Sequence, residues 1–248
     1  MPTIYLSPST QEWNPYVGGG TEEYYMNLIA DAMVPYLRSS GIRFTRNTPD
    51  MTAASSIRQS NEGNYDLHVA LHSNAAPEDE AGQRQGAEVY YYPNSVRGKR
   101  AADIIAENLK EIYPLPWLVK TVPTTSLGEV SKTRAPAVLI EFAYHDNPED
   151  ADWIRHNIPE IAANVVKSLT EYFDIPFVEA QPPRRGIVTV SSGWLNIRKK
   201  PSLQAPVIAR AWNGNPITVL GQWEGWYVVD YFGHIGYADS RYIRIRKI

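Results

Sequence analysis

The chain lacks cysteine altogether, over 248 residues. This absence excludes disulfide bonds, thiolate nucleophiles and cysteine-based zinc sites. Long apolar runs are also missing, because Asp, Glu, Arg or Pro interrupts each one before the roughly 20 residues that a membrane-spanning helix needs. Long runs of Lys and Arg are absent too, and the net charge is -3. We therefore expect neither a membrane span nor a nucleic-acid partner.

The N-terminal residues have neither the basic start nor the apolar core of a signal peptide. The sequence therefore shows no export route for a protein that would act outside the cell. With 43% hydrophobic and 21% charged residues, the composition is that of a folded globular protein with room for one large domain and a small one.

A proline-rich polar stretch at residues 180–186 indicates a boundary, and we place the linker at 178–186. In residues 1–178 short apolar runs alternate with helical patterns. The predicted strands are 3–6, 42–45, 67–71, 86–92 and 137–140, and the predicted helices are 22–39, 53–62, 95–112 and 158–173. This alternation predicts an α/β domain with a mainly parallel sheet flanked by helices.

In residues 186–248 the apolar pattern changes to a period of two, with Gly, Asn, Pro and Asp between the runs. Short, evenly spaced strands of this kind predict a small all-β barrel of about sixty residues.

The segment 66–75 reads DLHVALHSNA and combines an apolar strand with His68, His72 and a polar turn. Ligand sites of open α/β sheets lie at the carboxyl ends of strands, where His72 falls. Neutral imidazole is the commonest protein metal ligand. His72 is therefore a candidate ligand, or else a hydrogen-bonded loop residue. His68 would face the same side of the strand, and we expect it to have a packing role.

Glu141 ends the apolar run at 135–140. A carboxylate in such surroundings is usually paired or bound to a metal, and burial raises its pKa, which suits a general base. The alternative is an ion pair with Arg134 or Arg58. Glu22 and Glu23 open a predicted helix after Thr21, where acidic residues and a Thr cap are also favourable for structural reasons alone.

Taken together, these residues resemble the zinc amidases that cleave the bond between N-acetylmuramic acid and L-alanine of peptidoglycan, over about residues 3–174. Glu23, followed by Asn27, resembles the helix-borne zinc glutamate of that family, and the strand ending in His72 resembles its zinc histidine. The stretch PAVLIE at 136–141, with NPED at 147–150, resembles the segment that carries the catalytic glutamate, here Glu141. The resemblance implies Zn2+ as cofactor and peptidoglycan as substrate.

One family feature is missing. Members usually carry a histidine ligand in a Gly-His turn after the first strand, whereas residues 6–14 read LSPSTQEWN. Glu12 could supply a carboxylate in its place, and Gln11 or a water molecule are alternatives.

Residues 186–248 resemble a bacterial SH3-like domain, through LNIRKKPS at 195–202, the run at 226–229 and Gly236-Tyr237. Such domains commonly bind peptidoglycan, which would concentrate an enzyme at its polymeric substrate. The aromatic residues available for a core or a binding site are Trp194, Trp212, Trp223, Trp226, Tyr231 and Tyr237.

The resemblance therefore implies an amidase of the cell wall or the extracellular space. Zinc held by Glu23, His72 and Glu12 would polarise the scissile carbonyl and a water molecule, and Glu141 would accept the proton of that water. Two alternatives remain. One is a peptidoglycan-binding protein without catalysis, since the Gly-His turn is missing. The other is a zinc peptidase or deacylase that acts on wall peptides.

Overall fold

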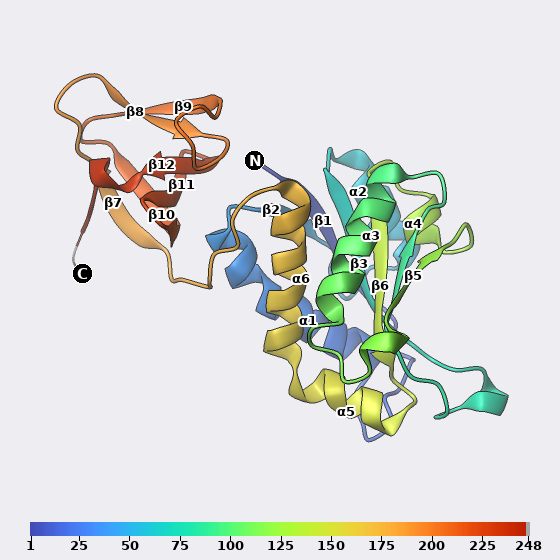
Figure 1. Cartoon of the computed structure of the whole chain (residues 1–248). Helices are drawn as coiled ribbons and strands as arrows, with labels where there is room; N and C mark the ends of the chain where they lie inside the picture. Colours follow the sequence, from blue (N-terminus) through green and yellow to red (C-terminus); the bar gives the residue numbers. More distant parts are fainter. Residues whose placement is uncertain (247–248) are drawn as a thin grey trace. The chain divides into compact units, whose positions relative to one another are not determined.

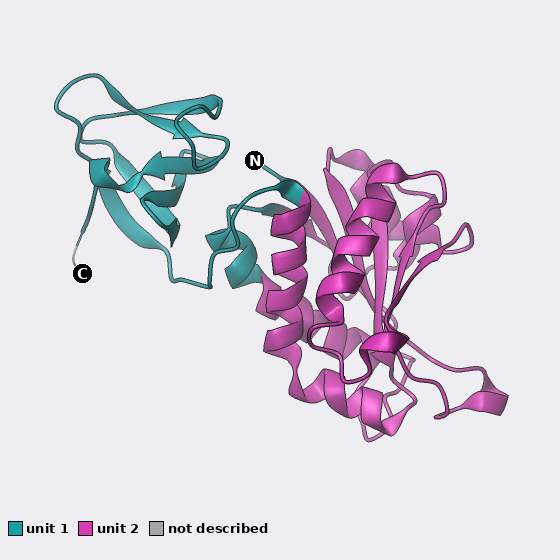
Figure 2. Cartoon of the chain, in the orientation of Figure 1, with its two compact units in different colours: residues 1–2, 34–43, 173–248 teal, residues 3–33, 44–172 magenta. Residues whose placement is uncertain are grey.

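The computed structural model describes residues 1–246 of the chain, which divide into two compact units (Figures 1 and 2). The larger unit comprises residues 3–33 and 44–172. The smaller unit comprises residues 1–2, 34–43 and 173–248, and it includes the whole of the predicted linker at 178–186.

The larger unit is built on a six-stranded sheet in the order β2-β1-β3-β6-β4-β5. Its strands are β1 (Thr3–Pro8), β2 (Arg43–Arg46), β3 (Leu67–Asn74), β4 (Glu88–Tyr91), β5 (Lys120–Pro123) and β6 (Ala137–Tyr144). The pairs β1 with β3, β3 with β6 and β4 with β5 are parallel, whereas β4 runs antiparallel to β6. The prediction of a mainly parallel sheet is confirmed. The two central strands β3 and β6 are buried almost throughout, which explains their continuous apolar sequences.

Six α-helices accompany this sheet within the described residues: α1 (Glu22–Ser39), α2 (Ala53–Glu62), α3 (Val96–Leu109), α4 (Gly128–Ser131), α5 (Pro148–His156) and α6 (Ile158–Phe173). The bounds of α1, α2 and α6 are those that the sequence predicts. The predicted helix 95–112 begins after its Ser95 cap and ends at Leu109. Neither α4 nor α5 was predicted. Helix α4 is a single turn, and α5 is short and begins at Pro148 after its cap Asn147.

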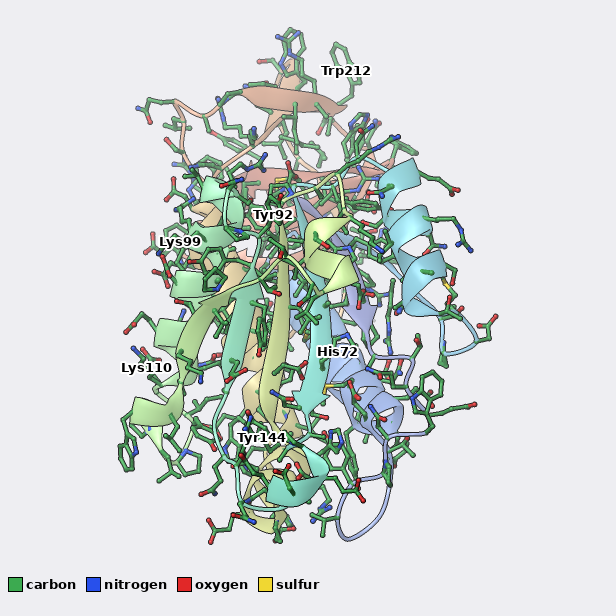
Figure 3. The ribbon with its side chains drawn as sticks, turned by 90° about the vertical axis from the view of Figure 1, so that its right-hand side faces the viewer. His72, Tyr92, Lys99, Lys110, Tyr144 and Trp212 are labelled. Atoms are coloured by element: carbon green, nitrogen blue, oxygen red, sulfur yellow. The ribbon has the colours of Figure 1, made fainter. Side chains whose placement is uncertain are left out.

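The face of the sheet that carries Tyr5 and His68 is covered by α2 and α4. Tyr5 donates to Gln59 of α2, and the ring of His68 stacks on Tyr5 and contacts Ser60 of α2. The views place α3 on the opposite side of the sheet from α2 (Figures 1 and 3). Helix α6 is bonded to α3 through Asn164, whose side chain donates to the carbonyl of Asn108.

The smaller unit carries a seven-stranded antiparallel sheet in the order β13-β7-β10-β11-β12-β8-β9. Its strands are β7 (Arg184–Val188), β8 (Trp194–Arg198), β9 (Val207–Trp212), β10 (Pro216–Trp223), β11 (Trp226–Tyr231), β12 (His234–Asp239) and β13 (Ile243–Ile245). A closed apolar core fills it, formed by Val188, Leu195, Ile197, Ala211, Ile217, Val219, Val229, Ala238 and Ile243. The predicted all-β fold of this part of the chain is confirmed.

A search of residues 1–246 finds no helix that combines the length and the apolar character needed to cross a membrane.

Asp150 fixes the end of β6 beyond Glu141. It is 2% exposed and accepts hydrogen bonds from the backbone of Tyr144 (2.9 Å), the backbone of Gly86 (3.1 Å) and the hydroxyl of Tyr113 (2.5 Å). Burial raises its pKa, and these donors partly offset that effect. The carboxylate thus joins helix α5, strand β6 and the loop that enters β4.

Asp150→Ala is expected to destabilise the protein by about 2–4 kcal/mol, because it leaves buried donors without an acceptor. Asp152→Ala on the same helix is the control, since the carboxylate of Asp152 is exposed and pairs with Arg155. Denaturant unfolding measures both, and equal effects of the two variants would contradict this role of Asp150.

Candidate active site

Three polar side chains lie in one row across the sheet. His72 of β3 is paired in register with Glu141 of β6, and Glu141 is paired with Glu88 of β4. Directly paired residues place their side chains on the same face of a sheet. In Figure 3, His72 and Tyr144 lie toward the same end of the sheet. That end is the one where β3 and β6 finish, as the sequence predicts for a ligand site of an α/β sheet.

The imidazole of His72 lies between two carboxylates and is 7% exposed. Its Nδ1 is 2.8 Å from Glu22 Oε1, and its Nε2 is 3.0 Å from Glu129 Oε2. Burial lowers the pKa of His72, but the hydrogen bonds to Glu129 and Glu22 outweigh burial and raise it well above its ordinary value. The ring is therefore fixed in orientation from both of its nitrogens.

Glu129, in the short helix α4, is shared by several donors. Its Oε1 accepts from the hydroxyl of Ser7 at 2.5 Å and lies 3.2 Å from Nε2 of His68. Burial raises the pKa of this carboxyl, but the hydrogen bonds from His68 and His72 outweigh burial and lower it well below its usual range. His68 is therefore buried, as predicted for a packing residue, and it also holds Glu129 in place beside His72.

Glu22, rather than its neighbour Glu23, reaches His72. Glu22 is 1% exposed, and its Oε2 accepts from Asn14 Nδ2 at 2.7 Å. Burial raises its pKa, but the contact with His72 dominates and lowers it. The reason is helical phase. Positions 22, 26, 29 and 33 share the buried face of α1, so residue 23 points elsewhere.

Two of the predicted metal ligands, Glu23 and Glu12, are more exposed than Glu22. Glu23 is partly exposed, and its backbone carbonyl accepts from Asn27 at 2.8 Å. Glu12 is exposed. Within the described residues, no hydrogen bond or ion pair connects Glu12 or Glu23 to His72. Gln11 does approach His72, since its Nε2 lies 3.4 Å from His72 Nδ1.

Glu141 has a carboxylate oxygen, Oε2, that is buried without a hydrogen-bond partner. Burial raises the pKa of this group to about 8; the charge of His72 opposes the shift, and the charges of Glu22, Glu88 and Glu129 add to it. The ion pair considered for Glu141 is not formed in the described part of the chain, and Arg134 instead donates to the carbonyl of Asn61. A proton acceptor with a pKa near neutrality suits acid–base chemistry.

No group of three or more His, Cys, Asp and Glu side chains in residues 1–246 has an arrangement that could hold a metal ion. The donors that converge on one point are His72 Nδ1, Glu22 Oε1 and the side-chain amide of Gln11. Sequence reasoning named Glu22 only together with Glu23, and it missed Glu129, which stands in a polar segment with no pattern around it.

The fold and the site together define the class: an α/β protein with a buried histidine–carboxylate site at the ends of its parallel strands. The comparison with known families is specific. The profile of the N-acetylmuramoyl-L-alanine amidase family matches residues 9–171, and that of the bacterial SH3 domain matches residues 193–244. The chain belongs to the N-acetylmuramoyl-L-alanine amidase family and carries a C-terminal bacterial SH3 domain.

Solved structures support the fold assignment. The amidase AmiC2 of Nostoc punctiforme is 18% identical with a TM-score of 0.62, and the match covers 70% of this chain and 97% of that one. The catalytic domain of the CD27L endolysin, which targets Clostridia difficile, is 22% identical with a TM-score of 0.57, covering 69% and 98%. The catalytic domain of CwlV, an amidase from Bacillus (Paenibacillus) polymyxa, is 15% identical with a TM-score of 0.60, covering 71% and 100%. No curated protein sequence matches the chain.

The aromatic residues of the SH3 domain have different environments. Tyr237 is fully buried, while Trp194 and Trp212 are 42% and 55% exposed. These two tryptophans face each other across β8 and β9 with ring centroids 5.3 Å apart, and Arg210 lies over the Trp194 ring at 4.7 Å. An exposed aromatic pair with a neighbouring cation is a surface suited to sugar or peptide ligands.

The raised pKa of Glu141 makes a prediction about stability. With a pKa of about 8 in the folded protein, against an ordinary value of 4.5, this carboxyl holds a proton only in the native state between those pH values. Stability then falls as pH rises, by up to about 1.4 kcal/mol per pH unit. Glu141→Gln removes this term, so the variant should gain stability relative to the parent from pH 5 to pH 8.

Denaturant unfolding in chelator-containing buffer measures this difference. His72, Glu22, Glu88 and Glu129, the charged groups that act on Glu141, are present in both proteins. Unfolding free energies that stay parallel over this pH range would contradict the raised pKa.

Proposed function

We propose that this chain hydrolyses the amide bond between the lactyl group of N-acetylmuramic acid and L-alanine in peptidoglycan, using zinc held at His72 and Glu22. The proposal rests on two features that meet at one end of the sheet and on the family match. The two features are the Nδ1 of His72 facing Glu22 at 2.8 Å and the unpaired oxygen of Glu141, and the family match covers residues 9–171.

The residues present fit a cation. The contact between Nδ1 and Glu22 requires a proton on Nδ1, and this proton occupies the place that a cation would take between the two groups. Glu129 binds the opposite nitrogen, Nε2, at 3.0 Å. A carboxylate behind a metal-binding histidine fixes the tautomer and the ring orientation and raises the basicity of the ligand. His72 would then present an unprotonated Nδ1, and Glu22 a carboxylate oxygen.

Zinc, when bound, supplies a Lewis acid that polarises the scissile carbonyl and lowers the pKa of a water molecule. Glu141 accepts the proton of the attacking water at its unpaired Oε2. The same carboxyl then donates that proton to the nitrogen of the leaving alanine, and its raised pKa suits both steps. Glu129, His68 and Ser7 act only through His72, by holding its ring in position.

Glu141→Gln is expected to lower hydrolysis of soluble muropeptides by more than about 100-fold, because the general base is lost, while it retains zinc. His72→Ala should lose both zinc and activity. Elemental analysis and product analysis measure these effects. Glu23→Ala is the control with little change expected.

The products also separate the proposal from its competitors. A free alanine amino group beside an intact lactyl carboxylate identifies the amidase, whereas cleavage within the peptide would identify a peptidase. A parent protein that takes up no zinc and releases no product would favour the non-catalytic wall-binding protein, for which the missing Gly-His turn is the motivation.

We also propose that the SH3 domain binds the wall and that the protein acts at the cell wall or outside the cell. The support is the domain match over residues 193–244 and the exposed pair Trp194 and Trp212 with Arg210 above it. Attachment to a polymeric substrate raises the effective concentration of the catalytic domain.

The double variant Trp194→Ala, Trp212→Ala should reduce hydrolysis of intact walls by about tenfold or more while leaving soluble muropeptides unaffected, because only the polymer can engage both domains. Turbidity of wall suspensions and muropeptide release measure the two. Phe232→Ala is the matched control, since Phe232 is also exposed, at 77%. Equal losses on both substrates would contradict a targeting role.

A further inference from the structure

The missing histidine of the first loop has a structural counterpart in Gln11. Its amide Nε2 lies 3.4 Å from His72 Nδ1 and 3.5 Å from Glu22 Oε1, while those two atoms are 2.8 Å apart. The three side chains therefore present one atom each to a common point. They come from the loop after β1, from the end of β3 and from the start of α1.

Two sides of this triangle have the length expected between the ligand atoms of a zinc site. Ligand atoms about 2.0–2.2 Å from a tetrahedral zinc ion lie about 3.3–3.6 Å from one another. The two separations that involve Gln11, measured to its Nε2, fall in that range, whereas the third, between His72 Nδ1 and Glu22 Oε1, has hydrogen-bond length. Three protein ligands with an open fourth position are the usual arrangement of a catalytic zinc site.

The orientation of the Gln11 amide decides which atom faces this point. Oxygen and nitrogen of a side-chain amide are assigned from their hydrogen bonds. Without a cation, the NH2 group faces the carboxylate of Glu22. With a cation, rotation by half a turn would present the oxygen, at the expense of the 3.2 Å bond from Asn14 to Gln11. Asn14 would keep its shorter bond to Glu22.

The loop holds Gln11 in this place independently of any ligand. The backbone of Ser9 donates to the carbonyl of Leu71 at 2.9 Å, which ties the loop to β3, and Gln11 N donates to the hydroxyl of Ser9 at 3.2 Å. At the other end, Glu22 N donates to the carbonyl of Asn14 at 3.0 Å, which ties the loop to α1. The same bonds leave the side chain of Glu12 exposed.

We propose that the side-chain amide oxygen of Gln11 is the third protein ligand of the zinc site, in the position that family members give to a histidine. This inference rests on the proposed function, since it assumes that His72 and Glu22 hold zinc. An amide oxygen is a poorer zinc ligand than an imidazole, so the site binds zinc more weakly than one with two histidines.

The test measures zinc affinity of the full chain by competition with a chromogenic chelator, for the parent, Gln11→Ala, Gln11→His and Glu12→Ala. Gln11→Ala is expected to weaken zinc binding by more than about tenfold. Loss of a residue that only supports a metal ligand already weakens binding by about tenfold or more, and Gln11 is proposed to be a ligand itself. Gln11→His should bind at least as tightly as the parent, and Glu12→Ala should equal it. Unfolding midpoints in chelator, equal for all four proteins, establish that folding is unchanged.

Unchanged zinc affinity in Gln11→Ala would overturn the role of Gln11 and leave the proposed function standing. A loss confined to Glu12→Ala would overturn it in favour of Glu12. A parent that binds no zinc and cuts no substrate would remove the proposed function and this inference together.

Discussion

The buried carboxylate of Glu129 is the interaction on which the rest of the site depends. A carboxylate removed from water is tolerated only when charged or hydrogen-bonding partners surround it, and here Ser7, His68 and His72 supply them. These partners come from β1 and β3, so one side chain of a single-turn helix joins two strands. Because Glu129 occupies Nε2 of His72, the other ring nitrogen is directed at Glu22. The contact of Glu129 with Nε2 thus determines which groups the Nδ1 atom of His72 can bind.

The direction of the strands explains why this end of the sheet gathers so much charge. Parallel strands β3 and β6 finish together, which brings His72 beside Glu141. Strand β4 runs the opposite way, and it therefore contributes its first residue, Glu88, to the same row. Lys120 balances Glu88 at 2.8 Å, whereas the Oε2 atom of Glu141 has no such partner. One carboxylate in the row is consequently structural, and its neighbour is left free to exchange protons.

The spacing of apolar residues predicted the long helices of the larger unit. Helices α1 and α6 repeat apolar residues over several turns, and their bounds were predicted correctly. The bounds of the shorter and more polar α2 were also predicted correctly. The ends of β3 and β6 were placed too early, because His72 and Glu141 are polar residues inside strands. The partners that hold His72 there, Glu22 and Glu129, are distant in the sequence. The antiparallel direction of β4 was also not predictable, since a strand pattern has the same period in either direction.

Of the carboxylates that contact His72, the sequence pattern could indicate Glu22 but not Glu129. The phase of α1 carried the information that Glu22 belongs to the buried face, four residues before Met26, and resemblance to a family motif pointed instead to Glu23. For Glu129 no comparable signal exists, because its position follows from tertiary packing alone. Positions 11–14 of the first loop offer three polar side chains. Gln11 and Asn14 lie beside Glu22, whereas Glu12 is exposed. In this chain, the bonds that anchor the first loop to β3 and α1 therefore place the side chain of Gln11 beside His72 and Glu22, although the Gly-His turn is missing.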